Sequence, residues 1–285
     1  MCIRDRVEEY TKEERMRLQK AFGYTYEEYR SSIGKMALNG VEATASMGID
    51  TPLAVLSHEH QPLFNYFKQL FAQVTNPPID CIREEIVTST SVYVGRDGNL
   101  LEEEPKNCQV LKINNPILTN TDMLKIKNMK VEGFKAVTVP ITYYKSAPLD
   151  RAMDRLFVEV DRAHRAGANI LILSDRGVDE NHVAIPSLLA VSAVHQHLVK
   201  TKKRTSLAII LESGEPREVH HFATLLGYGA CAINPYLALD TIHELIEEGM
   251  IKKDYYAAVE DYNHAVISGI VKIAAKMGCL LYTSP

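Results

Sequence analysis

From about residue 135 onward, short apolar runs alternate with stretches in which apolar residues recur every three or four positions. The run from Ile170 to Leu173 is continuously apolar, which is typical of a parallel strand covered on both faces. The stretch 148–167 instead carries a helical stripe, with Pro148 suited to its first turn and Gly167 to its end. We predict strands within 134–142, 168–177, 205–213 and 230–234, and helices within 148–167, 186–199, 215–229, 235–249 and 253–277. This alternation predicts β-α units with parallel strands.

The first 134 residues show a less regular pattern. Residues 11–40 are charged and helix-like, 46–57 form a small-residue loop that leads into an apolar run, and 84–101 has β-branched residues ended by Asp97-Gly98, which predicts a strand and a turn. The stretch 99–122 is polar and punctuated by prolines, which indicates a long irregular connection. A helix within 62–74 would place these residues on one face: Leu63, Phe67, Leu70, Phe71 and Val74. The predicted fold class is therefore α/β, with parallel β-α units in the C-terminal two thirds after a helical and irregular N-terminal part.

Composition narrows the classes of protein. The 285 residues are 46% hydrophobic and 24% charged with a formal net charge of -4, enough for one large domain or two small ones. The mild acidity argues against a nucleic-acid partner. Without an apolar run of about 18 residues or a signal peptide, we expect neither a membrane span nor export. The five cysteines are scattered, which suits a reducing compartment, predicts a cytoplasmic location and argues against disulfides or zinc.

The two ends do not match the periodicity of their neighbours. MCIRDR (1–6) and LLYTSP (280–285) look like translated adapter sequence rather than protein. We therefore expect artefact at 1–6 and 279–285, and one unit over 7–278 with an N-terminal part (7–134) and a β-α part (135–278).

Candidate chemistry lies where parallel strands end, because such sheets place ligand sites at their carboxyl edge. Those ends read Ser174-Asp175-Arg176-Gly177, Glu212-Ser213-Gly214 and Asn234-Pro235. One interpretation is an active site built on two carboxylates and an arginine. The other is structural: caps and ion pairs for Asp175 and Arg176, and a helix entry at Ser213-Gly214. The residues alone leave both open.

The ten histidines suggest packing rather than a metal site. His195 and His197 lie two apart on a predicted helix and point to different faces, and the adjacent His220 and His221 diverge as well. No dinucleotide, phosphate-loop, serine-hydrolase or zinc-protease motif occurs.

Several long motifs resemble the central domain of the glutamate synthase large subunit. They are collinear over residues 15–278 and read GYTYEEYR, SMGIDTPLAVLS, YFKQLFAQVTNPPIDCIREEIVTS, NNPILTN, LILSDRG, REVHHFATLLGYGACAINPYLA and KIAAKMG. The resemblance implies a domain that joins a glutamine amidotransferase to an FMN-binding synthase barrel. The intact enzyme converts glutamine and 2-oxoglutarate into two glutamates with electrons from a reduced donor. It passes ammonia internally between its two sites.

What the resemblance implies for this chain is a connecting role without catalytic residues or bound cofactor of its own, so we expect the chain alone to be inactive. The intact enzyme would hold FMN and a 3Fe-4S cluster. Its electrons would come from FAD and NAD(P)H on a partner subunit or from ferredoxin. The remaining partners would be the amidotransferase and FMN domains of the same chain. The strand-end residues would then be structural.

The resemblance also implies a passage for ammonia, with Met47 and Thr75 in its wall. Local sequence alone predicts only a stiff turn at QVTNPPID (73–80), where Pro77-Pro78 fixes the backbone. The resemblance adds a use for that stiffness, since the rigid loop would present a hydroxyl without a charge. The other residues that it assigns to the passage are Ser46, Gly48, Asn76 and Pro77. Those expected to approach the FMN domain are Lys276, Met277 and Gly278.

Two other interpretations stay open at this stage. An independent β/α barrel-type enzyme would use Asp175, Arg176 and Glu212, and it predicts a concave pocket where the three converge. A non-catalytic interaction domain of another multidomain protein predicts exposed apolar patches where its neighbours dock.

Overall fold

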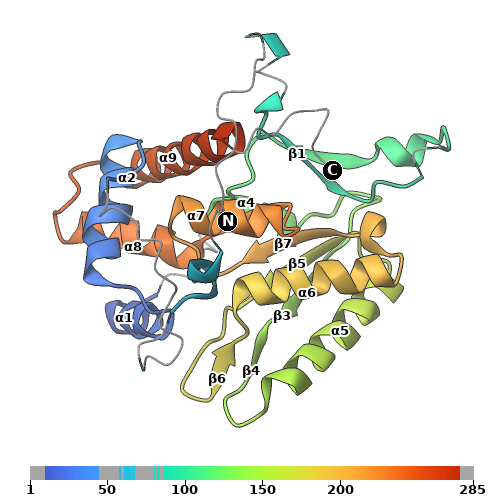
Figure 1. The fold of residues 1–285 in the computed structure, drawn as a ribbon, viewed down its shortest axis with the longest axis horizontal. Helices are drawn as coiled ribbons and strands as arrows, with labels where there is room; N and C mark the ends of the chain where they lie inside the picture. The colour runs from blue at the N-terminus through green and yellow to red at the C-terminus, as the bar shows by residue number, and fades with distance from the viewer. Residues whose placement is uncertain are drawn as a thin grey trace.

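The structure is a computed structural model that describes residues 10–44, 58, 61–67, 80, 82–83, 87–99 and 101–276. Its centre is a four-stranded parallel sheet in the order β3-β5-β7-β8 (Figure 1). The strands are β3 (Ala136–Pro140), β5 (Ile170–Ser174), β7 (Ala208–Glu212) and β8 (Ala232–Asn234). The helices that follow them are α5 (Leu149–Arg165), α6 (Ser187–Lys200), α7 (Val219–Gly227) and α8 (Tyr236–Glu247). The predicted α/β class and each predicted β-α unit are confirmed.

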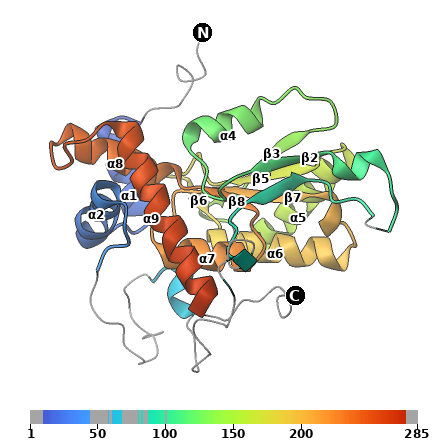
Figure 2. The same ribbon diagram turned by 90° about the horizontal axis from the view of Figure 1, so that it is seen from above.

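Both faces of the sheet are covered, which explains the continuous apolar strands. On β5, Leu171 and Leu173 join the large core on the side of α5, α6 and α7, whereas Ile170 and Ile172 pack against a second cluster. That second cluster includes Val94 of the β1–β2 hairpin and Met123 of α4 (Asn120–Lys127). Figure 2 shows α4 and the hairpin on one side of the sheet and α5 to α7 on the other.

The prediction of an irregular connection over 99–122 is wrong. Within it β2 (Val110–Ile113) pairs antiparallel with β1 (Val92–Gly95), and α4 begins at its end. The pattern missed β2 because the strand has only four residues and its Lys112 is exposed. The short pair β4 (Thr142–Tyr144) and β6 (His182–Ala184) was missed for a similar reason. A 3-10 turn, η4 (Pro105–Cys108), also lies in this stretch, and another, η5 (Arg204–Ser206), lies between α6 and β7.

A helical N-terminal part packs on the last two described helices. It contains α1 (Lys12–Ala21), the π-helix η2 (Glu28–Ile33) and α2 (Gly34–Asn39). α1 packs on α8, and α2 packs on the long α9 (Tyr255–Lys276). The N-terminal part is therefore built into the core that the β-α units form.

Arg217 joins the N-terminal part to the β-α units from a position that is only 1% exposed. Its guanidinium donates to the carbonyl oxygens of Phe22 at 3.3 Å and Gly23 at 3.0 Å. Its Nε lies 2.9 Å from a carboxylate oxygen of Glu28, and its centre lies 4.4 Å from the centroid of the Tyr24 ring. One buried side chain thus fixes the segment that follows α1.

The helix predicted within 62–74 takes a different form where it is described. Leu63–Tyr66 is a single 3-10 turn (η3), and Phe67 has extended backbone angles of φ -102 and ψ 108, so no α-helix begins there. Phe64 is fully buried and stacks on His221 at 4.4 Å between ring centroids. Tertiary packing of Phe64 therefore outweighs the helical periodicity. The other predicted face residues, Leu70, Phe71 and Val74, lie outside the described residues.

Candidate functional site

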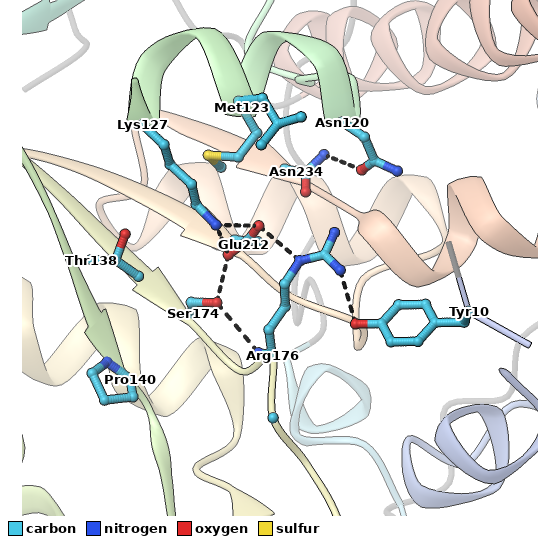
Figure 3. Close-up of a pocket in the computed structure, with 12 residues that line it drawn as sticks. Tyr10, Asn120, Met123, Lys127, Thr138, Pro140, Ser174, Arg176, Glu212 and Asn234 are labelled. Carbon is cyan, nitrogen blue, oxygen red and sulfur yellow. Dashed lines mark hydrogen bonds and ion pairs between the residues drawn. The ribbon is translucent and has the colours of Figure 1, made fainter. Parts of the chain in front are cut away.

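The carboxyl ends of the four parallel strands open into a cavity of about 560 Å³. Segment 116–118 runs beside β8, where Leu118 N donates to Ile233 O at 2.8 Å, and this pairing delivers α4 across the strand ends. Thr119 caps α4 by accepting a hydrogen bond from Asp122 N at 3.2 Å. The cavity therefore lies between the sheet edge and α4 (Figure 3). Its lining is Tyr10, Asn120, Met123, Leu124, Lys127, Thr138, Pro140, Ser174, Arg176, Gly177, Glu212 and Asn234.

Glu212 is the centre of the charged part of this cavity, and its side chain is only 2% exposed. Lys127 Nζ donates to both carboxylate oxygens at 2.8 Å, and Arg176 Nε donates to one of them at 2.9 Å. Ser174 Oγ donates to the other at 2.5 Å. Burial alone would raise the pKa of Glu212, but Arg176 and Lys127 hold that pKa below its ordinary value. Glu212 is therefore an ionised carboxylate with its charge compensated.

Aromatic rings fix the position of Arg176. Its guanidinium carbon lies 4.1 Å from the centroid of the Tyr236 ring and 5.7 Å from that of Tyr10. One of its terminal nitrogens donates to the hydroxyl of Tyr10 at 2.8 Å. A cation that stacks on aromatic faces and bonds a carboxylate is held in one orientation.

Asn234 ends β8 and is fully buried. Its amide nitrogen donates to the carbonyl oxygen of Leu118 at 2.9 Å and to Asn120 Oδ1 at 3.0 Å. The amide orientation is therefore fixed, since a backbone carbonyl can only accept. No donor among the described residues reaches the other amide atom, Asn234 Oδ1. In Figure 3 this oxygen lies on the side of Glu212 and Arg176.

Asp175 does not join the cavity, although its two neighbours in the chain do. Its carboxylate accepts a hydrogen bond from Ser213 Oγ and another from Gly214 N at 3.0 Å, and the residue is 1% exposed. Burial raises the pKa of Asp175 to about 7. The prediction that Asp175, Arg176 and Glu212 converge on one pocket holds for the last two only.

The geometry supports the structural interpretation of the strand ends over the catalytic one. Glu212 is held ionised by two cations, which makes it a weak proton acceptor. Ser174 Oγ donates to that carboxylate, and no histidine of the described residues lines the cavity to activate it. The ion pairs predicted for Arg176 are confirmed. The helix entry predicted at Ser213-Gly214 is wrong, because α7 begins at Val219 behind the N-cap residue Glu218.

The structure does not describe the residues predicted to line a passage, so that prediction stays open. Met47, Thr75, Ser46, Gly48, Asn76 and Pro77 all lie outside the described residues, as do Met277 and Gly278. Lys276 is the last residue of α9, and its side chain also falls outside the description.

Among the cavity residues that sequence reasoning missed are Lys127, Asn120 and Tyr10. Lys127 and Asn120 lie on α4, which begins at the end of the segment 99–122 interpreted as irregular. The signal was present, since Thr119 three positions before Asp122 is a helix start and Lys125 and Lys127 suit a helix end. Tyr10 reaches the cavity only through the tertiary packing of α1, which no local pattern reveals.

His195 and His197 make different contacts, as predicted. His197 stacks on Phe157 with 4.6 Å between ring centroids and lies 3.2 Å from a carboxylate oxygen of Asp161. His195 Nδ1 instead accepts a hydrogen bond from Arg204 at 3.0 Å.

Neither a metal centre nor a membrane span is visible in the part of the chain that the structure describes. None of its groups of His, Cys, Asp and Glu residues could hold a metal ion. Its described cysteines are Cys108, which is exposed, and Cys231, which is partly buried, and both are free. Among the described helices, none combines the length and apolar character that crossing a bilayer requires.

Comparison with known proteins gives one consistent answer. The family model of the glutamate synthase central domain matches residues 17–284. The glutamate synthase [NADPH] large chain of Bacillus subtilis is 47% identical over 260 residues, which cover 91% of this chain and 17% of that protein. The glutamate synthase [NADH] of Schizosaccharomyces pombe is 42% identical over 265 residues, which cover 90% of this chain and 13% of that protein. The ferredoxin-dependent glutamate synthase 2 of Synechocystis is 40% identical over 280 residues, which cover 93% of this chain and 18% of that protein.

The chain thus spans less than a fifth of the length of these relatives. Among solved structures, an L230A mutant flavocytochrome b2 with benzoylformate shows 15% identity and a TM-score of 0.34 over 43% of this chain and 29% of that one. That similarity is too low to indicate a shared fold or function.

Proposed function

This chain belongs to the glutamate synthase central domain family, and from that premise we propose that it connects the ammonia-producing and ammonia-consuming parts of a glutamate synthase. The observation that carries the proposal is the match of the family model to residues 17–284. The reaction of the whole enzyme would convert glutamine and 2-oxoglutarate to two glutamates with a reduced electron donor. The named relatives include NADPH, NADH and ferredoxin-dependent forms.

The chain itself would be non-catalytic. In the cavity at its strand ends, Lys127 and Arg176 hold the Glu212 carboxylate ionised. An ionised carboxylate paired in this way suits a structural role better than that of a proton acceptor. FMN and a 3Fe-4S cluster would belong to the intact enzyme. A cluster requires several cysteine thiolates in one place. Cys108 and Cys231 do not fit that requirement, because Cys108 ends η4 and Cys231 lies just before β8, in separate parts of the fold.

The specific role would be to shape an ammonia passage with Met47 and Thr75 in its wall. Ammonia that meets bulk water is protonated and lost, so the route must exclude water. A flexible thioether can adapt to a narrow wall. A threonine on a loop stiffened by Pro77 offers a hydroxyl without a charge. Ser46, Gly48 and Asn76 would shape the same loops. Lys276, Met277 and Gly278 would lead toward the FMN domain.

The test uses a complete glutamate synthase that contains this chain, with Thr75→Val and Met47→Ala made separately. Both half-reactions should persist, while glutamine consumption exceeds oxidation of the electron donor. The measurement is the ratio of glutamine consumed to donor oxidised, which is close to one when ammonia transfer is tight. A purely structural Met47 or Thr75 predicts equal loss of both activities with an unchanged ratio, and that result would remove the passage role.

A second test concerns the chain alone. If its function is to connect, the purified chain should neither hydrolyse glutamine nor retain FMN. Absorbance near the flavin bands after purification, together with a glutaminase assay, measures both properties. A yellow protein with one flavin per chain would contradict the proposal.

A further inference from the structure

We propose that the cavity at the carboxyl ends of the sheet binds a small organic monoanion in which a carboxylate stands next to an O–H or N–H donor. None of the residues that line this cavity belongs to the proposed ammonia passage, so the two proposals can fail independently. Three properties of the cavity favour such a ligand: its charge, an unsatisfied buried acceptor, and its volume.

The charge favours a monoanion. Three charged residues line the cavity, namely Lys127, Arg176 and Glu212, which leaves one positive charge in excess. Lys127 is the cation that can meet a ligand, because an ammonium has three protons and both of its hydrogen bonds go to Glu212. Its side chain is 26% exposed, so solvent reaches it. A dianion would bring an uncompensated charge close to the buried Glu212 carboxylate.

Asn234 supplies the second half of the recognition. Its Oδ1 is buried without a donor among the described residues, and its orientation is fixed by the bonds that its nitrogen makes to Leu118 O and Asn120 Oδ1. A buried acceptor of this kind is costly unless a donor reaches it. The oxygen lies on the cavity side, toward Glu212 and Arg176 (Figure 3). A ligand O–H or N–H is the matching group.

The volume of about 560 Å³ falls within the range of small-molecule sites. Apolar and polar groups both line the cavity, with Met123, Leu124 and Pro140 beside the charged residues. This mixture suits a ligand that carries a short apolar carbon chain in addition to its carboxylate and donor. The arrangement places the carboxylate at Lys127 on α4 and the donor at Asn234 on β8.

The first experiment compares lactate with pyruvate by isothermal titration calorimetry on this chain. The two are monoanions of nearly equal size, but only lactate has a hydroxyl that can donate to Asn234 Oδ1. The bulkier pair 2-hydroxy-3-methylbutyrate and 2-oxo-3-methylbutyrate repeats the comparison with a larger side chain. We expect the hydroxy acid of a pair to bind at least about tenfold more tightly than its oxo partner, the ratio that one hydrogen bond can supply.

The second experiment locates the site with three variants. Lys127→Met removes the proposed carboxylate partner. Thr138→Phe places a bulky ring in the cavity from an exposed position on β3 that takes no part in the ion pairs of Glu212. Both should weaken binding of the hydroxy acid at least about tenfold. Lys125→Met is the matched control, because Lys125 lies on the same helix but outside this cavity, and it should bind like the parent chain.

Three results would overturn the proposal. Equal affinity for the hydroxy and oxo acids would remove the role of Asn234. Undiminished binding in Thr138→Phe would place the ligand elsewhere. No saturable binding of any of the four acids up to about 10 mM, weaker than ordinary ligand affinities, would leave the cavity as a structural network only.

Discussion

Lys127 Nζ lies 2.8 Å from both carboxylate oxygens of Glu212, although the two residues stand 85 positions apart in the chain. The contact ties the end of α4 to the end of β7. A buried carboxylate with several compensating partners contributes little net stability, but removing one partner exposes the cost of burying its charge. The Lys127–Glu212 ion pair therefore holds the two sides of the cavity together.

The Lys127–Glu212 ion pair predicts that Lys127→Met destabilises the chain. Glu212 would keep Arg176 and Ser174, so we expect a loss of about 1–3 kcal/mol in the free energy of unfolding, below the cost of stripping a buried charge of all its partners. Urea unfolding measures it. Lys125→Met is the control, since the Lys125–Asp122 pair is exposed and should cost no more than about 0.5 kcal/mol. Equal losses of unfolding free energy in the two variants would contradict a stabilising role for the Lys127–Glu212 ion pair.

Asp175 predicts a pH dependence of stability. Burial raises its pKa in the folded chain to about 7, whereas an unfolded aspartate has a pKa of about 3.9. The folded state therefore binds the proton more tightly. The contribution of Asp175 to stability falls as pH rises from about 4 to about 7 and is constant above that, by on the order of 4 kcal/mol in total.

The variant Asp175→Asn isolates this effect from other titrating groups. Asparagine can still accept from Gly214 N, and its amide can donate to Ser213 Oγ once that hydroxyl turns. Relative to the parent, the variant should gain stability steadily as pH rises through this window. Urea unfolding of both proteins at several pH values gives the difference. Parallel stability profiles would show that Asp175 titrates at its ordinary pKa when folded.

Much of the fold could be predicted from the sequence because it depends on local periodicity. The apolar run Ile170–Leu173 and the stripe of α5 are strong patterns, and both gave correct elements. β2 and β6 have four and three residues, too few for a period to stand out, and their stability comes from pairing with a distant partner. The turn at Leu63–Tyr66 shows the opposite case, in which burial of Phe64 prevails over a helical pattern.

The cavity was only half predictable for the same reason. Strand ends such as Ser174 and Glu212 follow directly from the parallel arrangement. Lys127 and Tyr10 arrive from α4 and from the segment before α1, and their positions depend on packing between elements far apart in the chain. Asp175 lies between two cavity residues in sequence, yet it turns into the interior toward Ser213.

Arg217 predicts a test of how the N-terminal part is held. Arg217→Met should cost about 3–5 kcal/mol in unfolding free energy, because it leaves Glu28 without its buried partner and the carbonyls of Phe22 and Gly23 without donors. Arg217→Lys keeps the charge but not the planar fork, and it should recover only part of the loss. Limited proteolysis should cleave first between α1 and η2 in both variants. Full recovery by lysine would show that charge alone matters.

Gly214 and Gly227 differ in the space that a side chain would have. A Cβ on Gly214 would lie 2.7 Å from Phe22 Cε2, closer than real Cβ atoms approach a neighbour, and 3.1 Å from the hydroxyl of Tyr236, which is a tight contact. Phe22 is itself buried against Tyr236, so it has little room to retreat. Gly214→Ala should therefore lower the free energy of unfolding by about 1–3 kcal/mol, the usual cost of overpacking.

Gly227 is the matched control for that substitution. It lies at the end of α7, its backbone is not in the left-handed region, and a Cβ there would meet nothing within 4 Å. Gly227→Ala should raise stability by about 0.4–1 kcal/mol, because alanine restricts the unfolded chain more than glycine does. Urea unfolding of the two variants side by side separates lack of space at Gly214 from a general cost of replacing glycine. If both substitutions moved stability in the same direction, the close packing of Phe22 on Gly214 would not be what requires a glycine there.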